Sequence, residues 1–206
     1  MSERKSRKDA ARNREAVLAA ADALFARGAS PADITMADVA AAAGVGKGTL
    51  FRAFGDRAGL LRALYEARLE PIRAAVESGP PPLGPATPPR ERVPALLDAL
   101  LRLKLDNRLL ALALEDGGGT SPYRAEHYER WHGLLQGALE QIPGLADSDF
   151  TAHALLAAVR ADLVEHLAAE GRVPRERLRA QLANFVTKAL ASGPSQGSAA
   201  EDRAAP

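Results

Sequence analysis

The sequence predicts an all-α protein with a small N-terminal group of helices and a larger C-terminal helical domain. Apolar residues recur at intervals of three and four along most of the chain, and no segment shows the two-residue alternation of a β-strand. Glycine and proline fall between the periodic segments, where helices should end. With 206 residues, 47% of them hydrophobic, the chain can bury a core of its own.

The composition excludes several classes of protein. The chain has no cysteine, which excludes disulfides, thiolate metal sites and a cysteine nucleophile. It has no apolar run of about 20 residues and no signal-peptide core, so we expect a cytoplasmic protein. The net charge of +1 is unevenly spread, because residues 1–14 carry six basic and two acidic side chains. Such a basic segment is typical of nucleic-acid or anionic-membrane binding, and equally of a solvated tail.

The first third of the chain predicts four helices. An amphipathic helix carries Val17 through Phe25, and a second begins after Thr35, whose partner Asp38 completes an N-terminal capping pattern. Gly44 ends that helix at about Ala43, and a third is expected over Lys47–Phe54. Asp56 then caps a long helix.

The rest of the chain predicts four longer helical segments after a proline-rich connector, GPPPLGPATPP. We expect them over about 90–115, 122–142, 149–170 and 174–191. The predicted organisation is a basic flexible arm (1–14), a helix-turn-helix domain (15–55), a connecting helix (56–78), the linker (79–89), a helical domain (90–191) and a disordered tail (192–206).

Three glycines within five residues, Gly44, Gly46 and Gly48, favour a tight turn between two helices over a phosphate-binding loop. A P-loop needs Ser or Thr after its Gly-Lys pair, and Gly48 stands there instead. A dinucleotide-binding GxGxxG also fails, because Thr49 occupies the place of its third glycine. Gly44 can adopt the positive φ that such a turn requires.

The stretch ITMADVAAAAGVGKGTLFRAFGDRAGLL resembles the DNA-binding signature of the TetR (tetracycline-repressor-like) regulators of bacteria. The resemblance extends from about Arg12 to Tyr65. It implies a homodimer whose second short helices enter successive major grooves of a palindromic operator. It also implies a C-terminal domain that encloses a small-molecule pocket and dimerises through its last two helices, so that the protein is a ligand-released repressor.

Residue roles follow from the resemblance, position by position. By this resemblance Lys47, Thr49 and Arg52 would contact base edges, and Gly48 would allow the helix a close approach. Thr35 and Arg57 would contact phosphates. Phe51 stands where the family usually has a phosphate-binding tyrosine, so we expect it to serve mainly in packing. The predicted DNA-binding residues are Thr35, Lys47, Gly48, Thr49, Phe51, Arg52 and Arg57.

Expectations for the C-terminal domain are coarser. Two apolar stripes, Leu155–Val159–Leu163 and Leu178–Leu182–Phe185–Ala189, are candidates for a four-helix dimer interface, and otherwise for the monomer core. Polar and aromatic residues among leucines suggest a largely apolar effector pocket, with no cofactor. Its candidate lining is Leu103, Asn107, Tyr123, His127, Tyr128, Trp131 and His166.

Two other classes of function remain open. Asp162 and His166, four residues apart, with His153 on the same predicted helix, raise the possibility of a metal-dependent enzyme. Two such ligands do not complete a zinc site, so we expect a surface pair, no metal and no enzyme activity. The second alternative is a DNA-binding architectural protein without ligand control.

Overall fold

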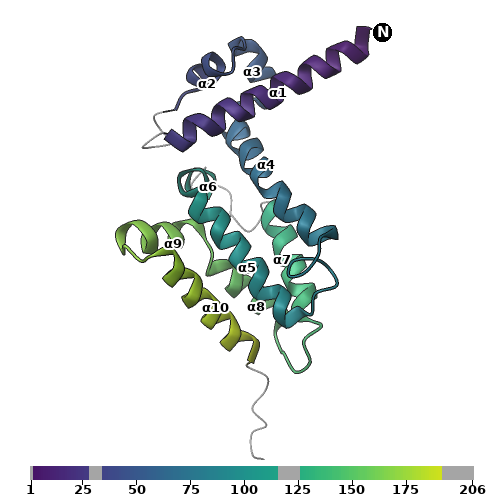
Figure 1. Ribbon diagram of the computed structural model, residues 1–206, viewed down its shortest axis with the longest axis vertical. Helices are drawn as coiled ribbons and strands as arrows, with labels where there is room; N and C mark the ends of the chain where they lie inside the picture. The colour runs from purple at the N-terminus through teal and green to yellow at the C-terminus, as the bar shows by residue number, and fades with distance from the viewer. Residues whose placement is uncertain (1, 28–33, 116–125, 192–206) are drawn as a thin grey trace, which may run out of the picture.

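The computed structural model describes residues 2–27, 34–115 and 126–191, and every regular element within these ranges is a helix. The N-terminal unit consists of α1 (Ser2–Arg27), α2 (Met36–Ala42) and α3 (Lys47–Phe54). Figure 1 shows that α4 (Arg57–Ser78) leads from this unit into the C-terminal domain. That domain contains α5 (Pro89–Asp106), α6 (Arg108–Glu115), α7 (Glu126–Leu139), α8 (Ser148–Ala157), α9 (Ala161–Glu165), the π-helix η3 (His166–Glu170) and α10 (Arg175–Ala191).

The N-terminal basic segment differs from the prediction. Residues 2–14 were expected to form a flexible arm, but they are the first turns of α1, which begins at Ser2. Residues 2–27 contain neither glycine nor proline and are rich in alanine and arginine, which favour helix. The basic side chains of this segment are therefore carried on a helix. The predicted tail over 192–206 lies outside the described residues.

The turn between α2 and α3 has the predicted construction. Thr35 and Asp38 form a capping box at the start of α2, and Gly44 adopts a φ of +65° just after its end. The turn closes through a hydrogen bond from the Val45 N–H to the Ala40 carbonyl (3.0 Å). Ala40 is buried, so the two helices meet closely at this point.

Helix α4 belongs to both halves of the molecule. It packs against α1 and α3 in the N-terminal unit and against α5 and α6 in the C-terminal domain. Its first turns bury Leu60, Leu61 and Leu64. Lower down, the Arg68 guanidinium forms an ion pair with Asp22 of α1. The helix is continuous from the N-terminal unit to the connector at residue 79.

Two segments predicted as single helices are interrupted. The segment 90–115 breaks at Asn107, whose backbone leaves the helical region (φ −130°, ψ 34°), and α6 begins after it. The segment 149–170 breaks between α8 and α9 and ends in η3. The predicted start of the 122–142 helix lies partly outside the described residues, which resume with α7.

Ion pairs join helices on either side of these breaks. Arg108 at the start of α6 pairs with Glu165 of α9 through two hydrogen bonds of 2.6 Å, and these bonds lower the pKa of Glu165. Arg179 of α10 pairs with Asp98 of α5 in the same two-pronged way and lowers the pKa of that carboxyl. Both are bidentate pairs, whose planar geometry fixes the orientation of the helices as well as their separation.

The same substitution at two glycines should change stability in opposite directions. Alanine at Gly44 would meet no atom within 4 Å but must hold a positive φ, so Gly44→Ala should lower the free energy of unfolding by about 1–2 kcal/mol. Gly48 lies within α3 and also has open space at its Cβ position. Gly48→Ala should therefore raise that free energy, by about 0.5 kcal/mol.

Urea denaturation followed by circular dichroism measures both changes. Gly44→Asn is the control, because asparagine tolerates the left-handed region better than alanine and should recover part of the loss. A destabilising Gly48→Ala, or a neutral Gly44→Ala, would contradict this account of the turn.

Candidate nucleic-acid interface and ligand pocket

Helix α3 is amphipathic, with one face in the core and the other in solvent. Leu50 (0% exposed) and Phe54 (8%) hold it against the rest of the N-terminal unit. The side chains of Lys47, Thr49 and Arg52 are all exposed, as is Gly48. The structure therefore leaves the predicted base-contacting positions open to solvent on one helix.

Phe51 departs from the prediction that it serves mainly in packing. Its side chain is 47% exposed, because the helix turns it away from the face that carries Leu50 and Phe54. An exposed aromatic ring on this helix is available for apolar contact with a partner.

The N-terminus of α2 lies beside this helix. The Thr35 hydroxyl donates to Asp38 Oδ2 (2.6 Å), the Thr35 N–H donates to the same oxygen (2.9 Å), and the Asp38 N–H donates to the Thr35 hydroxyl (3.2 Å). The Thr35 side chain is the main cause of a lowered Asp38 pKa, and the charge of Lys47 lowers it further. Asp38 thus places a carboxylate near the basic start of α3.

Two arginines brace the ends of the helix-turn-helix. Arg57 is half-buried and its Nε donates to the Ile34 carbonyl (3.3 Å) at the entrance to α2. Arg14 of α1 donates to the Ala53 carbonyl (3.4 Å) and lies 4.7 Å from the centroid of the Phe54 ring. The Arg14 contact was not predicted. It connects the basic half of α1 to the C-terminal end of α3.

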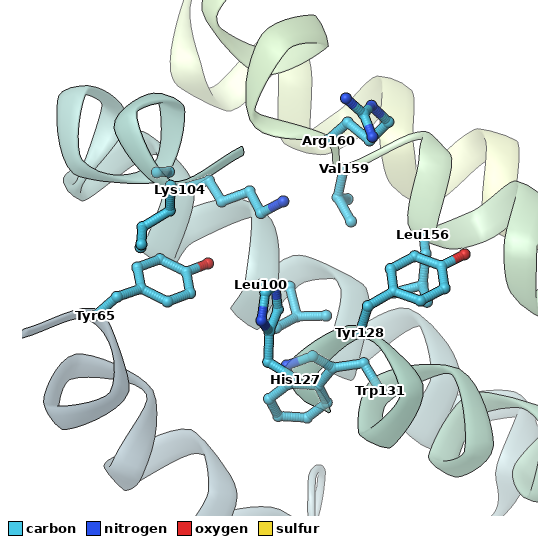
Figure 2. Close-up of a pocket in the computed structure, with 11 residues that line it drawn as sticks. Tyr65, Leu100, Lys104, His127, Tyr128, Trp131, Leu156, Val159 and Arg160 are labelled. Carbon is cyan, nitrogen blue, oxygen red and sulfur yellow. The ribbon is translucent and has the colours of Figure 1, made fainter. Parts of the chain in front are cut away.

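A pocket opens in the C-terminal domain between α4, α5, α6, α7 and the α8–α9 junction. Tyr65 and Tyr128 lie on opposite sides of it, and Lys104 extends from α5 beside Tyr65 (Figure 2). Most of the wall is apolar or aromatic. The lining residues are Tyr65, Leu100, Lys104, Ala111, Leu114, His127, Tyr128, Trp131, Leu156, Val159 and Arg160.

Three of the predicted pocket residues, His127, Tyr128 and Trp131, line this pocket. Three others do not. Leu103 is buried in the core on another face of α5. Asn107 uses its side-chain amide to bond the Leu103 carbonyl (2.7 Å) at the helix break, and His166 is exposed beside Glu170. Tyr123 lies outside the described residues.

Sequence reasoning missed Tyr65, Lys104 and Arg160. Tyr65 lies on the connecting helix (56–78), for which no pocket residue was predicted. Arg160 lies in the interruption between the end of α8 at Ala157 and the start of α9 at Ala161, whereas the sequence predicted one continuous helix there. The edge of the Tyr65 ring meets His127 of α7, with ring centroids 6.4 Å apart.

Asp162 and His166, the candidate metal ligands, each interact with a different side chain. Asp162 accepts hydrogen bonds from Arg160 through both carboxylate oxygens, and Arg160 lowers the pKa of Asp162. His166 Nδ1 lies 2.5 Å from Glu170. The two residues form separate surface pairs.

The predicted dimerisation stripes divide between core and surface. In the first, Leu155 and Val159 are buried within the chain, and in the second, Leu178 and Leu182 are also buried. The remaining large members are exposed, Leu163 by 39% and Phe185 by 43%. Phe150 of α8 is 74% exposed as well.

Comparison with known proteins agrees with the geometry of the N-terminal unit. Residues 17–64, which span α1 to α4, match the model of the family described as bacterial regulatory proteins, tetR family. The N-terminal unit is a TetR-family DNA-binding domain. The matched residues include the whole α2–turn–α3 unit and the first turns of α4.

Similarity to relatives extends over the C-terminal domain. The HTH-type transcriptional regulator SAR0097 of Staphylococcus aureus is 28% identical over 164 residues, covering 78% of this chain and 84% of that protein. A TetR-family transcriptional regulator from Rhodococcus has a similar structure, with a TM-score of 0.63 and 25% identity over 86% of this chain and 98% of that one.

The same fold occurs in NalD, the secondary repressor of the MexAB-OprM multidrug efflux pump in Pseudomonas aeruginosa. NalD has a TM-score of 0.57 and 17% identity, over 88% of this chain and 97% of its own. No helix in the described ranges is both long and apolar enough to cross a membrane. The family model and the relatives together indicate a transcriptional regulator of the TetR type, with a helix-turn-helix unit and a helical C-terminal domain.

Proposed function

We propose that this regulator binds a palindromic operator as a homodimer and releases it when a small, largely apolar molecule enters the pocket. The observation that carries the DNA-binding part is the exposed face of α3, where Lys47, Thr49 and Arg52 project from a helix anchored by Leu50 and Phe54. A helix held in this way can enter the major groove without losing its packing.

Each side chain on this face suits a known contact. Arginine and lysine can bind the O6 and N7 atoms of guanine, and the threonine methyl can contact a thymine methyl. Gly48 adds no bulk where the helix approaches the base edges. Thr35 and Arg57 flank the helix, where phosphate contacts would hold its register. Phe51 adds an exposed apolar surface beside them.

Arg52 and Arg57 should differ in what they contribute to DNA binding. Arg52→Ala removes a base contact and should cost about 1–3 kcal/mol at one operator position, relaxing the sequence preference there. Arg57→Ala removes a phosphate contact and should weaken all sequences alike while reducing the slope of affinity against salt. Fluorescence anisotropy with the operator and single-base variants, at several salt concentrations, separates the two effects.

Circular dichroism serves as the folding control for both variants, because Arg57 also bonds the Ile34 carbonyl. The proposal fails if Arg52→Ala leaves both affinity and base preference unchanged.

The dimer is proposed through the last helices of the domain. Among the described residues, four large apolar side chains are exposed, and apart from Phe51 they lie on α8, α9 and α10 (Phe150, Leu163 and Phe185). Large apolar side chains that remain exposed on these helices are candidates for an interface. Pairing of these helices about a two-fold axis would cover them and place two copies of α3 on one face of DNA.

A charge at Phe185 should therefore dissociate the dimer. Burial of the glutamate in Phe185→Glu without a partner opposes association, whereas Phe185→Leu keeps an apolar side chain and should remain dimeric. Sedimentation velocity across a range of concentrations measures the change. A Phe185→Glu protein as dimeric as the wild type would place the interface elsewhere.

The pocket supports control by a ligand. Its wall is formed mainly by leucine, valine, alanine and aromatic side chains, and a few polar groups lie around it. Tyr65 belongs to α4, eight residues after Arg57, so a molecule that displaces the Tyr65 ring acts on the helix that supports α3. A coupling of about 1–3 kcal/mol between the sites would be enough for useful release.

A larger side chain in the pocket wall should prevent release by the ligand without weakening DNA binding. Trp131 is the one tryptophan of the chain and lines the pocket, so quenching of its fluorescence identifies ligands from a panel of small aromatic compounds. Leu114→Phe adds bulk to the wall and should abolish release by those ligands while leaving operator affinity within about twofold. Leu112→Phe on the same helix is the control, because Leu112 is not among the lining residues.

The same experiment distinguishes the alternatives. If no compound that quenches Trp131 shifts operator affinity, the protein binds DNA without ligand control. The metal-dependent enzyme has no support from the Asp162 and His166 pairs, and the family favours a regulator. As a regulator of bacterial operators, the protein would act in the cytoplasm.

A further inference from the structure

Three side chains that can bind a metal meet between α7 and α8. His132 comes from α7, and Asp149 and His153 lie one turn apart on α8. One possible ligand atom from each lies within 4.8 Å of the other two. His132 Nε2 is 3.3 Å from Asp149 Oδ1, and the two imidazole rings are stacked with centroids 3.9 Å apart.

We propose that this cluster binds a divalent transition-metal ion of the Zn²⁺ type. Two imidazoles and one carboxylate form a recognised three-residue zinc ligand set, in which water completes the tetrahedron. Imidazole nitrogen favours Zn²⁺, Cu²⁺ and Ni²⁺ over Mg²⁺ and Ca²⁺, which prefer oxygen. The set is distinct from the Asp162 and His166 pairs described above.

The positions of the three residues favour such a site. Asp149 and His153 are four residues apart and therefore share one face of α8. Ligands of tetrahedral zinc lie about 3.3 Å from one another, given bonds of about 2.0–2.1 Å, so rotation of the side chains suffices to close the cluster. The His132 side chain is 14% exposed and that of Asp149 is 67% exposed, which gives an ion a path from solvent.

Tyr128 connects this cluster to the ligand pocket. Its hydroxyl lies 2.6 Å from Nδ1 of His153, and its ring is stacked near both histidines. Histidines that ligate a metal commonly give their second nitrogen to such an outer partner, which fixes the ring. Because Tyr128 also lines the pocket, a metal at the cluster would hold one wall of that pocket in place.

The test uses untagged, full-length protein freed of metal by a chelator. Titration with Zn²⁺ against a chromophoric indicator should show one ion per chain bound at the cluster, and Co²⁺ in its place should give the visible absorption of a four-coordinate site. Asp149→Asn and His153→Ala should each weaken Zn²⁺ binding by at least tenfold. Tyr128→Phe should weaken it by about tenfold, as expected for an outer partner.

Matched variants keep the result interpretable. His166→Ala removes an exposed histidine outside the cluster and should leave Zn²⁺ affinity unchanged. Asp149 is largely exposed, so Asp149→Asn should fold normally, and circular dichroism of the metal-free proteins confirms it. The proposal is overturned if the protein does not bind Zn²⁺, if excess Mg²⁺ displaces it, or if Asp149→Asn and His153→Ala bind like the wild type.

These readouts do not depend on DNA. A protein that binds Zn²⁺ but no operator would contradict the proposed function and leave the metal site supported. A protein that binds its operator but no Zn²⁺ would contradict the metal site and leave the proposed function supported. The consequence for regulation rests on the proposed function. Zn²⁺ should shift the ligand concentration at which Trp131 fluorescence is half quenched, and Asp149→Asn should remove that shift.

Discussion

A single continuous helix, α4, is the constraint on which the rest of the structure depends. Its 22 residues span about 33 Å at 1.5 Å per residue, and they are shared by two packed units. Leu60 and Leu61 are buried in its first turns, and the Arg68–Asp22 ion pair fixes it to α1. Helix α4 therefore provides a direct packing connection between the C-terminal domain and α3.

The structure of the N-terminal unit could be predicted because its signals are local. The capping box of Thr35 and Asp38 fixes the start of α2, and Gly44 is needed where φ is positive. Each signal acts through a few neighbouring atoms, so the sequence alone specifies the outcome. The exposed face of α3 follows from the same short-range pattern, since burial of Leu50 and Phe54 leaves the intervening residues outside.

The C-terminal domain was harder to predict because its decisive interactions join distant residues. Asn107 interrupts what reads as one helix, and the pair formed by Arg108 and Glu165, 57 residues apart, orients the new segment. On α10, the buried positions follow Leu178, Leu182, Val186 and Leu190, whereas the predicted stripe passed through Phe185. A helix with apolar residues around much of its circumference can bury either the face with Val186 or the face with Phe185. The packing of α5 against α10 determines which of the two is buried.

The helix breaks also explain why the pocket residues were only partly predicted. His127, Tyr128 and Trp131 lie on a regular helix, whereas Arg160 enters the lining through the break between α8 and α9. Irregular backbone at such a site places side chains that helical periodicity cannot anticipate. The part of the pocket lining that comes from this break is therefore the part that the sequence predicts least well.

The two tyrosines on opposite sides of the pocket belong to helices with different packing partners. Tyr65 stands on α4, which supports the DNA-binding unit, and Tyr128 stands on α7, which packs firmly against α8. A ligand between them can produce a shift only through a difference in its affinity for two positions of the walls. If a metal ion fixes the position of Tyr128, the ligand can favour one wall position over another mainly through Tyr65 and α4. Rigidity on one side of the pocket would then increase the displacement delivered to the other.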